Sequence, residues 1–149
     1  MATIELSIDL GSKFITIYQK GIGLVLREPA IAIATKVRNR LEIRDAGYRA
    51  ESVMTGSLGG ARVIAPIKEG IIVDEEMATM LLAYFLKKIM PEGLFAPRVK
   101  AIVSICESSS SSDRRAVEKC CLKAGIKEVT LVESGLSLLA YTNSIGGLF

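Results

Sequence analysis

Three apolar runs separated by short turns open the chain, and this pattern constrains the fold more than any other feature. Residues 4–8 alternate apolar and polar side chains, which is the period of a half-buried strand. Residues 14–19 are rich in β-branched and aromatic side chains, and a glycine-containing turn at residues 20–23 leads into a third run at residues 24–34. We therefore expect three antiparallel strands, with an irregularity at Pro29, because proline cannot donate to a strand ladder.

The segments that follow alternate between helical and strand patterns. Residues 36–62 are charged and rich in glycine near their end, which we interpret as an inserted segment with a flexible tip and a short helix near residues 47–55. Apolar residues at helical spacing after Asp74 predict an amphipathic helix that ends near Ile89. The short apolar run at residues 99–105 is typical of a buried strand.

Five consecutive serines at residues 108–112 allow two interpretations. They could form a disordered linker. We favour a loop followed by a helix start, because Ser110 and Asp113 have the spacing of a capping box and apolar residues at helical spacing follow. A strand over residues 129–133 and a short helix over residues 136–141 complete the pattern. This order predicts an α/β fold, a mixed five-stranded sheet with helices packed on it.

Composition excludes several classes of function. The 149 residues contain no His, which removes His-based catalytic triads, proton shuttles and metal sites. The net charge of +3 and the aromatic content of 5% argue against a nucleic-acid partner. Cys106, Cys120 and Cys121 make an odd number, so a disulfide framework is not expected, and we interpret the adjacent pair as small buried side chains of a helix.

Targeting signals are not expected in the chain. The first residues lack the basic region and cleavage site of a signal peptide. No apolar run approaches the roughly 20 residues of a membrane-spanning helix. These observations favour a cytoplasmic location.

The first two predicted strands meet at Asp9, Leu10 and Gly11, followed by Ser12 and Lys13. An acid and a glycine are favoured in ordinary turns. A turn between strands can also direct several backbone N–H groups toward one anion. The residues alone therefore allow both a plain turn and a phosphate-binding loop.

Seven segments, in the order in which they occur, resemble the MreB family of bacterial rod shape-determining proteins, within the actin and heat-shock-chaperone ATPase superfamily. They are IDLG at 8–11, YQKGIGLVLREPAI at 18–31, APIKEGIIVDEE at 65–76, YFLKK at 84–88, PRVKAIVSI at 97–105, DRRAV at 113–117 and AGIKEVTLVES at 124–134. The resemblance covers nearly the whole chain. It implies a single actin-like ATPase (ribonuclease H-like) lobe over residues 1–149, with a core over residues 1–35 and 64–149 and a small inserted subdomain at about residues 36–63.

The same resemblance implies roles for the first turn. In this family the first hairpin surrounds the phosphates of ATP, so Asp9, Gly11, Ser12 and Lys13 become candidate cofactor-binding residues. The resemblance also implies that Asp9 acts on Mg²⁺ indirectly, through water. Glu133 becomes the candidate for the catalytic acid that positions the attacking water.

Three departures from the family pattern lower our expectation of catalysis. Phe14 stands where the family has an amide, and a phenyl ring cannot hydrogen-bond a phosphate. Ungapped matching places Ser134, not Glu133, at the position of the acid, and a shift by one residue would reverse the side of the strand. The family has two lobes with the nucleotide between them, whereas this chain resembles the first. We expect weak or absent ATP binding and no hydrolysis by these residues alone.

A second implied site lies in the loop at residues 90–97. In this family a Leu-Phe pair in the loop inserts into the membrane, and Leu94 with Phe95 matches it. Positive charges flank the loop, at Lys87, Lys88 and Arg98. The alternative is that the two apolar side chains cover the edge of the sheet, and both interpretations remain open.

The resemblance as a whole implies an MreB-like actin homologue in cell-shape determination. It implies ATP-linked filaments, peripheral at the inner membrane, with other copies, the membrane surface and cell-shape proteins as partners. Two alternatives remain open. One is a non-catalytic actin-like binding module without nucleotide. The other is a chaperone-like ATPase fragment, to which LLAY at residues 138–141 is similar.

Overall fold

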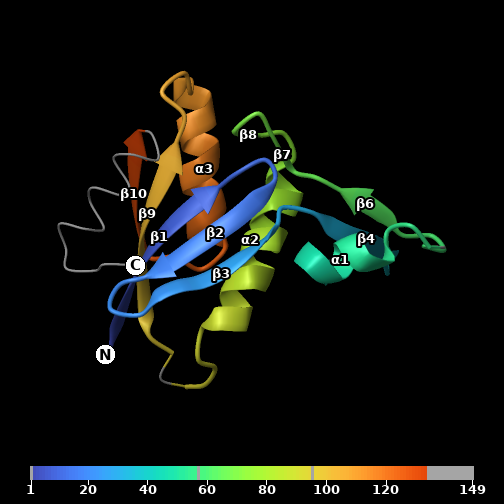
Figure 1. Cartoon of the computed structure of the whole chain (residues 1–149), viewed down its shortest axis with the longest axis horizontal. Coiled ribbons are helices and arrows are strands. Elements are labelled where there is room, and N and C mark those ends of the chain that lie inside the picture. The colour runs from blue at the N-terminus through green and yellow to red at the C-terminus, as the bar shows by residue number, and fades with distance from the viewer. Residues whose placement is uncertain (1, 57, 95, 134–149) are drawn as a thin grey trace.

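A mixed sheet of five strands forms the centre of the molecule in the computed structural model, which describes residues 2–56, 58–94 and 96–133 (Figure 1). Its strand order is β10-β9-β1-β2-β3. The strands are β1 (Thr3–Leu10), β2 (Phe14–Gln19), β3 (Gly23–Pro29), β9 (Arg98–Ile105) and β10 (Glu128–Glu133). The first three form an antiparallel meander, and β9 and β10 extend it in parallel with β1. The prediction of a mixed five-stranded sheet with helices is confirmed.

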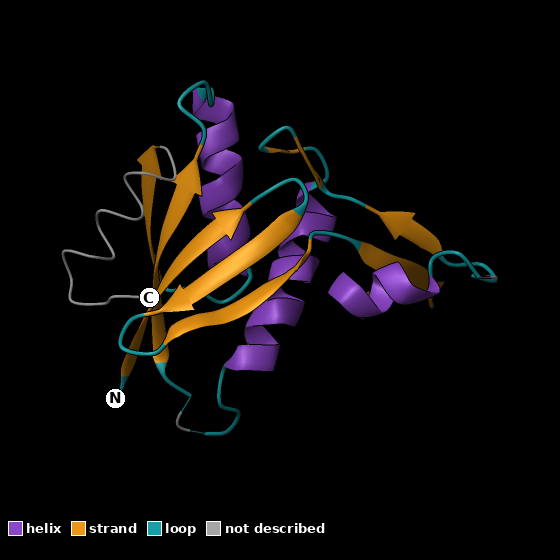
Figure 2. Cartoon of the chain, viewed as in Figure 1, coloured by secondary structure: helices purple, strands orange, loops and turns teal. Residues whose placement is uncertain are grey.

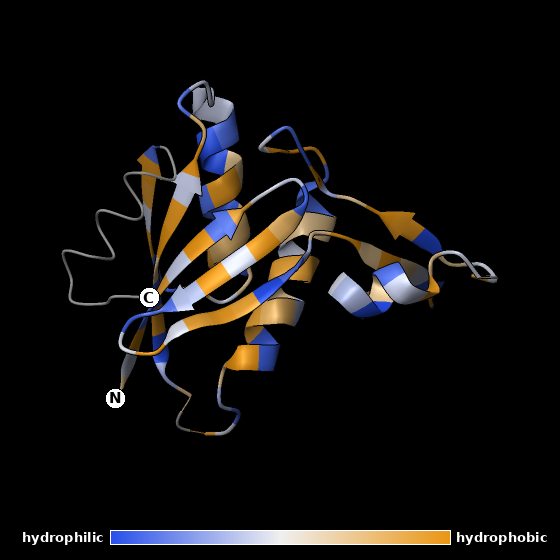
Figure 3. Cartoon of the chain, viewed as in Figure 1, coloured by the Kyte–Doolittle hydropathy of each residue, from blue (hydrophilic) through white to orange (hydrophobic). Residues whose placement is uncertain are grey.

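Two helices, α2 (Glu75–Ile89) and α3 (Ser111–Lys123), pack side by side on one face of this sheet (Figure 2). The strands turn alternate side chains toward these helices, so that Ile8, Ile17 and Val103 are fully buried in one core with Leu81 and Phe85. Figure 3 shows the resulting alternation of apolar and polar residues along the strands. The alternation of apolar and polar residues that predicted these strands therefore also determines which of their faces is buried.

Both helices begin at the side chains that the sequence indicates. Asp74 caps α2 by accepting a hydrogen bond from the N–H of Met77. Ser110 and Asp113 exchange the two hydrogen bonds of a capping box at the start of α3. The serine run is thus a helix start, and the linker interpretation is wrong. The buried positions of Cys120 and Cys121 on α3 are confirmed, and Cys106 is an exposed free thiol.

The third predicted strand, residues 24–34, is confirmed as far as Pro29, where an irregularity was expected, and is wrong beyond it because the chain divides there into two strands of different sheets. The first is β3, which ends at Pro29, and the second is β4 (Ala32–Val37). Strand β4 pairs with β5 (Arg40–Ala46) and β6 (Arg62–Ile64) in a separate three-stranded sheet. Proline ends the first ladder, and Ala30 donates to the carbonyl of Lys13 before the chain leaves the main sheet.

The segment predicted to be an insertion with a flexible tip contains more strands than expected. The helix α1 (Gly47–Val53) agrees with the predicted short helix, but β5 was not predicted. The short hairpin of β7 (Ile67–Lys68) and β8 (Ile71–Ile72) then leads into α2. The helix expected over residues 136–141 lies outside the described residues.

Glu28, on β3 of the main sheet, joins that strand to α1 and α2. One carboxylate oxygen of Glu28 accepts from the N–H of Tyr48 on α1 at 3.1 Å, and the other pairs with Lys88 on α2 at 2.6 Å. Gly47 has a φ of 63°, and a Cβ there would collide with the carboxylate of Glu28. A glycine is therefore required for this close approach.

Candidate functional site at the carboxyl ends of the strands

Asp9 lies in a row of polar residues that crosses the sheet. Its register partners are Thr16 on β2 and Ser104 on β9, and Arg27 on β3 is opposite Thr16. Residues directly opposite each other in neighbouring strands project from the same face. This face is opposite to the one that α2 and α3 cover, because Ile8 and its partners project toward those helices. The row therefore forms an open polar surface near the carboxyl ends of β1 and β9.

The carboxyl group of Asp9 has a raised pKa. Its side chain is accessible to solvent, yet the surrounding sheet removes part of its hydration, and this desolvation is the cause of the raised pKa. Carboxylates with a raised pKa are common at binding sites. The strand ends of an α/β sheet are also where ligands bind, so Asp9 is a candidate binding group.

The loop after Asp9 is shaped by Gly11 and Ser12. A Cβ at Gly11 would lie 2.6 Å from the carbonyl oxygen of Phe14, so the turn itself excludes a larger residue. The hydroxyl of Ser12 accepts a hydrogen bond of 2.9 Å from the N–H of Gly70, in the turn between β7 and β8. Lys13 is exposed and makes no ion pair with any described residue. The predicted cofactor residues Asp9, Gly11, Ser12 and Lys13 thus lie within residues 9–13 at one turn, and the Ser12 hydroxyl already accepts from Gly70.

Phe14 is packed between two side chains from other elements. The guanidinium carbon of Arg27 lies 4.4 Å from the centre of its ring, and the ring of Tyr48 on α1 lies 6.5 Å away. Arg27 therefore stacks on an aromatic face, and it pairs with no acid among the residues that the structure describes. The position at which the family has an amide has become a contact between β2, β3 and α1.

The structure does not bring Glu133 together with Asp9. Glu133 pairs with Arg114 on α3 at 2.6 Å. Its register partner Ile105 is buried on the helix-covered face, so Glu133 projects to the side opposite the polar row. Ser134, the other residue considered for this role, lies outside the described residues, and the catalytic role of Glu133 stays a prediction.

Leu94 is almost fully accessible in the loop between α2 and β9, with 97% of its surface exposed. Phe95 lies outside the described residues. Of the flanking cations, Lys88 is paired with Glu28 and Arg98 with Glu128, whereas Lys87 makes no ion pair with a described residue. Across residues 2–56, 58–94 and 96–133, no helix is long and apolar enough to cross a membrane.

Thr16, Ser104 and Arg27 were not identified from the sequence. Their place beside Asp9 depends on the register of four strands, of which β9 is distant along the chain. A single sequence carries no direct signal for such a register. The hydrogen bond between Ser12 and Gly70 was missed for the same reason, because 58 residues separate the two.

The side chains around Asp9 suit a hydrated cation better than a directly bound one. In the described part of the chain, no three His, Cys, Asp or Glu side chains gather to hold a metal ion. Asp9 is the single carboxylate of the row, and Thr16 and Ser104 offer hydroxyl oxygens beside it. Oxygen ligands and retained water are typical of Mg²⁺. The donor set therefore fits a hydrated cation such as Mg²⁺ held through water, whereas the ring of Phe14 cannot hydrogen-bond a phosphate.

Comparison of sequences identifies similar proteins over nearly the whole chain. Residues 3–140 match the family model described as MreB/Mbl protein. The cell shape-determining protein MreB of Escherichia coli (strain K12) is 29% identical over 139 residues, which cover 92% of this chain and 40% of that protein. The cell shape-determining protein Mbl of Bacillus subtilis (strain 168) is 30% identical over 129 residues, which cover 87% of this chain and 38% of that protein. The chain therefore spans about two fifths of the length of the curated relatives it matches.

Solved structures show the same fold at lower identity. MreB5 of Spiroplasma citri bound to AMPPNP superposes with a TM-score of 0.72 at 21% identity, covering 89% of this chain and 39% of that one. The double helical filament of MamK superposes with a TM-score of 0.70 at 13% identity, covering 88% of this chain and 41% of that one. This likeness confirms the predicted actin-like fold.

Proposed function

Because the chain belongs to the MreB/Mbl family, we propose that it is an actin-like protein of bacterial cell-shape determination that binds ATP with Mg²⁺ at the turn between β1 and β2. The observation that carries this proposal is the position of Asp9, a carboxylate with a raised pKa between Thr16 and Ser104 at the carboxyl ends of the strands. That edge is where α/β sheets bind their ligands.

Each residue of the turn would contribute in a different way. Asp9 would orient water molecules around the cation, since it is a single carboxylate. Gly11 lets the turn close against the carbonyl oxygen of Phe14 and so holds the neighbouring residues in place. Lys13 would supply a positive charge to a phosphate, and Ser12 retains its O–H as a donor while it accepts from Gly70. Bound Mg²⁺ would neutralise charge on the phosphates.

Turnover is not part of the proposal for these residues alone. The chain spans about two fifths of its relatives, and an open sheet face buries one side of a ligand, whereas tight sites bury most of it. We expect affinity for ATP weaker than about 0.1 mM and no hydrolysis.

A non-catalytic binding module is the second candidate function. The stacking of Arg27 on Phe14 favours it, because this pair occupies the position from which an amide would reach the phosphate. Such a module would keep the fold and bind other cell-shape proteins without nucleotide.

Titration of the 149-residue chain with ATP and Mg²⁺, followed by NMR or calorimetry, decides between the two candidates. Weak saturable binding that Asp9→Ala abolishes would support the nucleotide site. Glu51→Ala, which removes an exposed acid of α1, is the matched control and should bind as the parent does. Binding absent at millimolar ATP would leave the non-catalytic module. Binding unchanged by Asp9→Ala would reject the turn between β1 and β2 as the nucleotide site.

Self-association and membrane contact complete the proposal. Solved neighbours include a filament, MamK, and this chain would likewise assemble with copies of itself in the cytoplasm. The exposed Leu94, with Phe95, would contact the inner membrane peripherally.

A further inference from the structure

Two exposed apolar side chains occupy the hairpin between β2 and β3. Ile22 is 69% exposed and Leu24 is 55% exposed. Ile22 has a glycine on each side, so the adjacent residues carry no side chain that could cover it. We call residues 20–24 the hairpin tip. A single exposed apolar side chain is ordinary on a protein surface, whereas several at one place indicate a contact site.

The hairpin tip lies at the same end of the main sheet as the loop at residues 90–97 (Figure 1). The N–H of Lys20 donates to the carbonyl of Glu5 in the first half of β1, and the N–H of Arg98, where β9 begins, donates to the carbonyl of Ala2. Strands β2 and β9 are the two neighbours of β1 in the sheet, so their axes are about 10 Å apart. The hairpin tip and the loop at residues 90–97 therefore share one end of the sheet.

This end carries the two most exposed large apolar side chains of the residues that the structure describes. They are Leu94 and Ile22, and Leu24 adds a third. The three side chains come from two connections that are distant along the sequence. Their gathering at one end is therefore a property of the fold.

The hairpin tip is held in place by hydrogen bonds and carries one charge, which is already paired. The N–H of Ile22 donates to the carbonyl of Gln19 at 3.0 Å, which closes the turn. The ammonium group of Lys20 pairs with Glu5 at 2.8 Å. Burial of the hairpin tip would therefore order little additional backbone.

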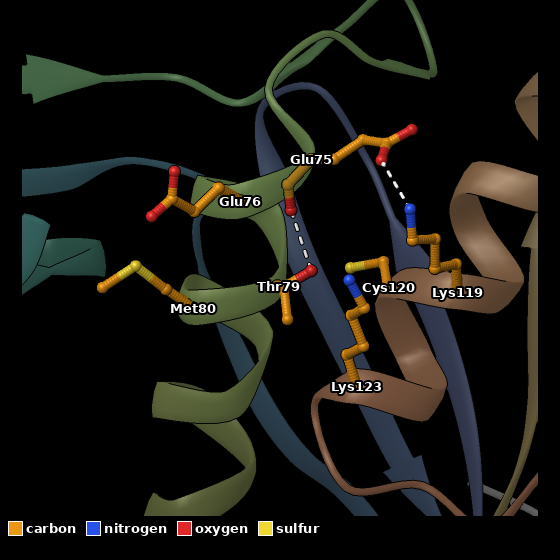
Figure 4. A pocket seen from close by; sticks show the side chains of 7 residues that line it. All are labelled: Glu75, Glu76, Thr79, Met80, Lys119, Cys120 and Lys123. Atoms are coloured by element: carbon orange, nitrogen blue, oxygen red, sulfur yellow. Dashed lines mark hydrogen bonds and ion pairs between the residues drawn. The ribbon is translucent and has the colours of Figure 1, made fainter.

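The helices that cover the opposite face of the sheet offer a different kind of surface. A hollow of about 410 Å³ between α2 and α3 is lined by two glutamates and two lysines beside smaller and apolar residues. Figure 4 shows Glu75 of α2 directed toward Lys119 of α3, with which it pairs at 3.7 Å. Transfer of these charges into an apolar medium would be unfavourable. The end of the sheet, and not the helical face, is therefore suited to lipid.

We infer that the hairpin tip is a second membrane contact, which enters the bilayer together with Leu94. The three apolar side chains are separate points on two connections. Fluid hydrocarbon accommodates such points, whereas a protein partner would need a matching pocket for each. This inference rests on the proposed membrane contact of the loop at residues 90–97 and extends it to another element of the fold.

Two contacts restrict the orientation of the sheet more than one contact does. A chain held by one loop can rotate about that loop in every direction. Contacts at the hairpin tip and at Leu94 instead place the amino end of β1 against the bilayer, so that β1 leads away from it. Strand β1 has 8 residues and is about 26 Å long. The turn at Asp9 is then held away from the membrane, up to about that distance.

Tryptophan reporters on tethered chains test the insertion of the hairpin tip. The chain contains no Trp and no His, so an introduced indole is the single reporter and an N-terminal histidine tag is the single tether. Nickel-chelating vesicles of zwitterionic and anionic lipid would hold the full chain at the surface, which removes most of the entropic cost of binding. Bromine atoms placed deep in the acyl chains quench an indole that has entered the hydrocarbon.

The emission of Ile22→Trp should shift to shorter wavelength on these vesicles. Its quenching should be within about twofold of that of Leu94→Trp, because both positions are exposed and would be transferred into the same apolar medium. Val73→Trp is the matched control, since Val73 is 56% exposed and precedes α2, at the other end of that helix from the loop at residues 90–97. It should be neither shifted nor quenched.

A second variant separates the effect of the hairpin tip from the preference of the indole itself for membranes. Leu24→Ser, added to Ile22→Trp, should shift the insertion equilibrium about tenfold toward solution, because one apolar side chain fewer is transferred into lipid. Leu122→Ser, at an exposed leucine on α3, should leave the quenching unchanged. Circular dichroism verifies that these variants fold, which is expected because the substituted side chains are exposed.

The outcomes separate this inference from the proposed function. Quenching of Ile22→Trp no greater than that of Val73→Trp, or unaffected by Leu24→Ser, overturns the hairpin tip as a membrane contact. Quenching of Leu94→Trp alone would overturn it and leave the loop at residues 90–97 as the membrane contact. Quenching of Ile22→Trp alone would support the hairpin tip and reject the loop. A reporter that stays in water at all three positions would exclude both contacts.

Discussion

Asp9 is a residue whose charge opposes folding. Desolvation raises its pKa above the ordinary value of 3.8, so the folded chain holds the proton more tightly than the unfolded chain does. Its ionisation therefore lowers stability as pH rises from the ordinary pKa through the folded pKa, and the loss is complete above that range. A carboxylate kept at such a position supports a binding role.

Asp9→Asn should stabilise the chain at neutral pH. The amide removes the ionisation without changing the shape, and we expect the thermal midpoint at pH 7 to rise by roughly 1–2 °C. The gain should disappear as the pH falls below about 4, where the parent is protonated as well. Differential scanning calorimetry across this range measures it, with Glu51→Gln as the control for loss of one surface charge. A gain that is equal at every pH would mean that the carboxylate does not act through its titration.

The start of α3 allows a test at the scale of one element. The hydroxyl of Ser110 accepts from the N–H of Asp113, and the carboxylate of Asp113 accepts from the N–H of Ser110. Ser110→Ala should lower the free energy of unfolding by about 1 kcal/mol. Ser112→Ala, inside the same helix and exposed, should lower it little or not at all, since alanine is the better helix former. Urea denaturation of both variants provides the comparison.

The capping of α3 should also weaken in acid. The hydrogen bonds from Ser110 lower the pKa of Asp113, so its contribution is present at neutral pH and fades as the pH falls through the folded pKa. The difference between the parent and Ser110→Ala should therefore shrink in acid. A difference that grows there would contradict the capping box.

Helices and strands with a regular apolar period and clear ends were predictable from the sequence. Those that lack one of these two features were missed. The helices α2 and α3 have apolar stripes and caps, and β9 is a compact apolar run. Strand β5 was missed because charged side chains separate its apolar residues Leu41 and Ile43, although these two carry the period of a strand. The break between β3 and β4 could not be predicted locally, because β3 and β4 belong to different sheets only through the strands with which they pair.

The residues of the candidate site also fall into those that the sequence predicts and those that it does not. Asp9, Gly11, Ser12 and Lys13 lie within residues 9–13 and could be named from a short motif. Thr16 and Ser104 join them only through the register of distant strands. Side chains that reach a site through long-range pairing leave no local signature.

At the scale of the whole molecule, the two proposed contact surfaces lie at opposite ends of the sheet (Figure 1). Asp9 is near the carboxyl end of β1, whereas Leu94 precedes the first residue of β9, which is parallel to β1. The loop at residues 90–97 can therefore face a membrane while the turn between β1 and β2 stays open to a nucleotide. The free Lys87 lies beside this loop, and the other flanking cations are paired within the fold.

Membrane contact through Leu94 should depend on assembly. Burying one leucine in lipid contributes about 1.5–3 kcal/mol, which does not offset the loss of freedom when a single chain binds. An oligomer multiplies the contact, so flotation with anionic vesicles should be barely detectable for the single chain and measurable for the assembled one. Added salt should reduce flotation only in part, because Lys88 and Arg98 are paired within the fold and the screened attraction to anionic lipid comes mainly from Lys87.

The double variant Leu94→Ser, Phe95→Ser should lose this flotation under conditions in which it oligomerises as the parent does. Because Leu94 is 97% exposed, its replacement should leave the thermal midpoint unchanged. Leu122→Ser, at an exposed leucine on α3, is the matched control and should float normally. Equal flotation of the parent and the double variant would exclude the loop as the membrane contact. A large fall in the thermal midpoint of the double variant would instead place part of the pair in the core and return the edge-covering interpretation.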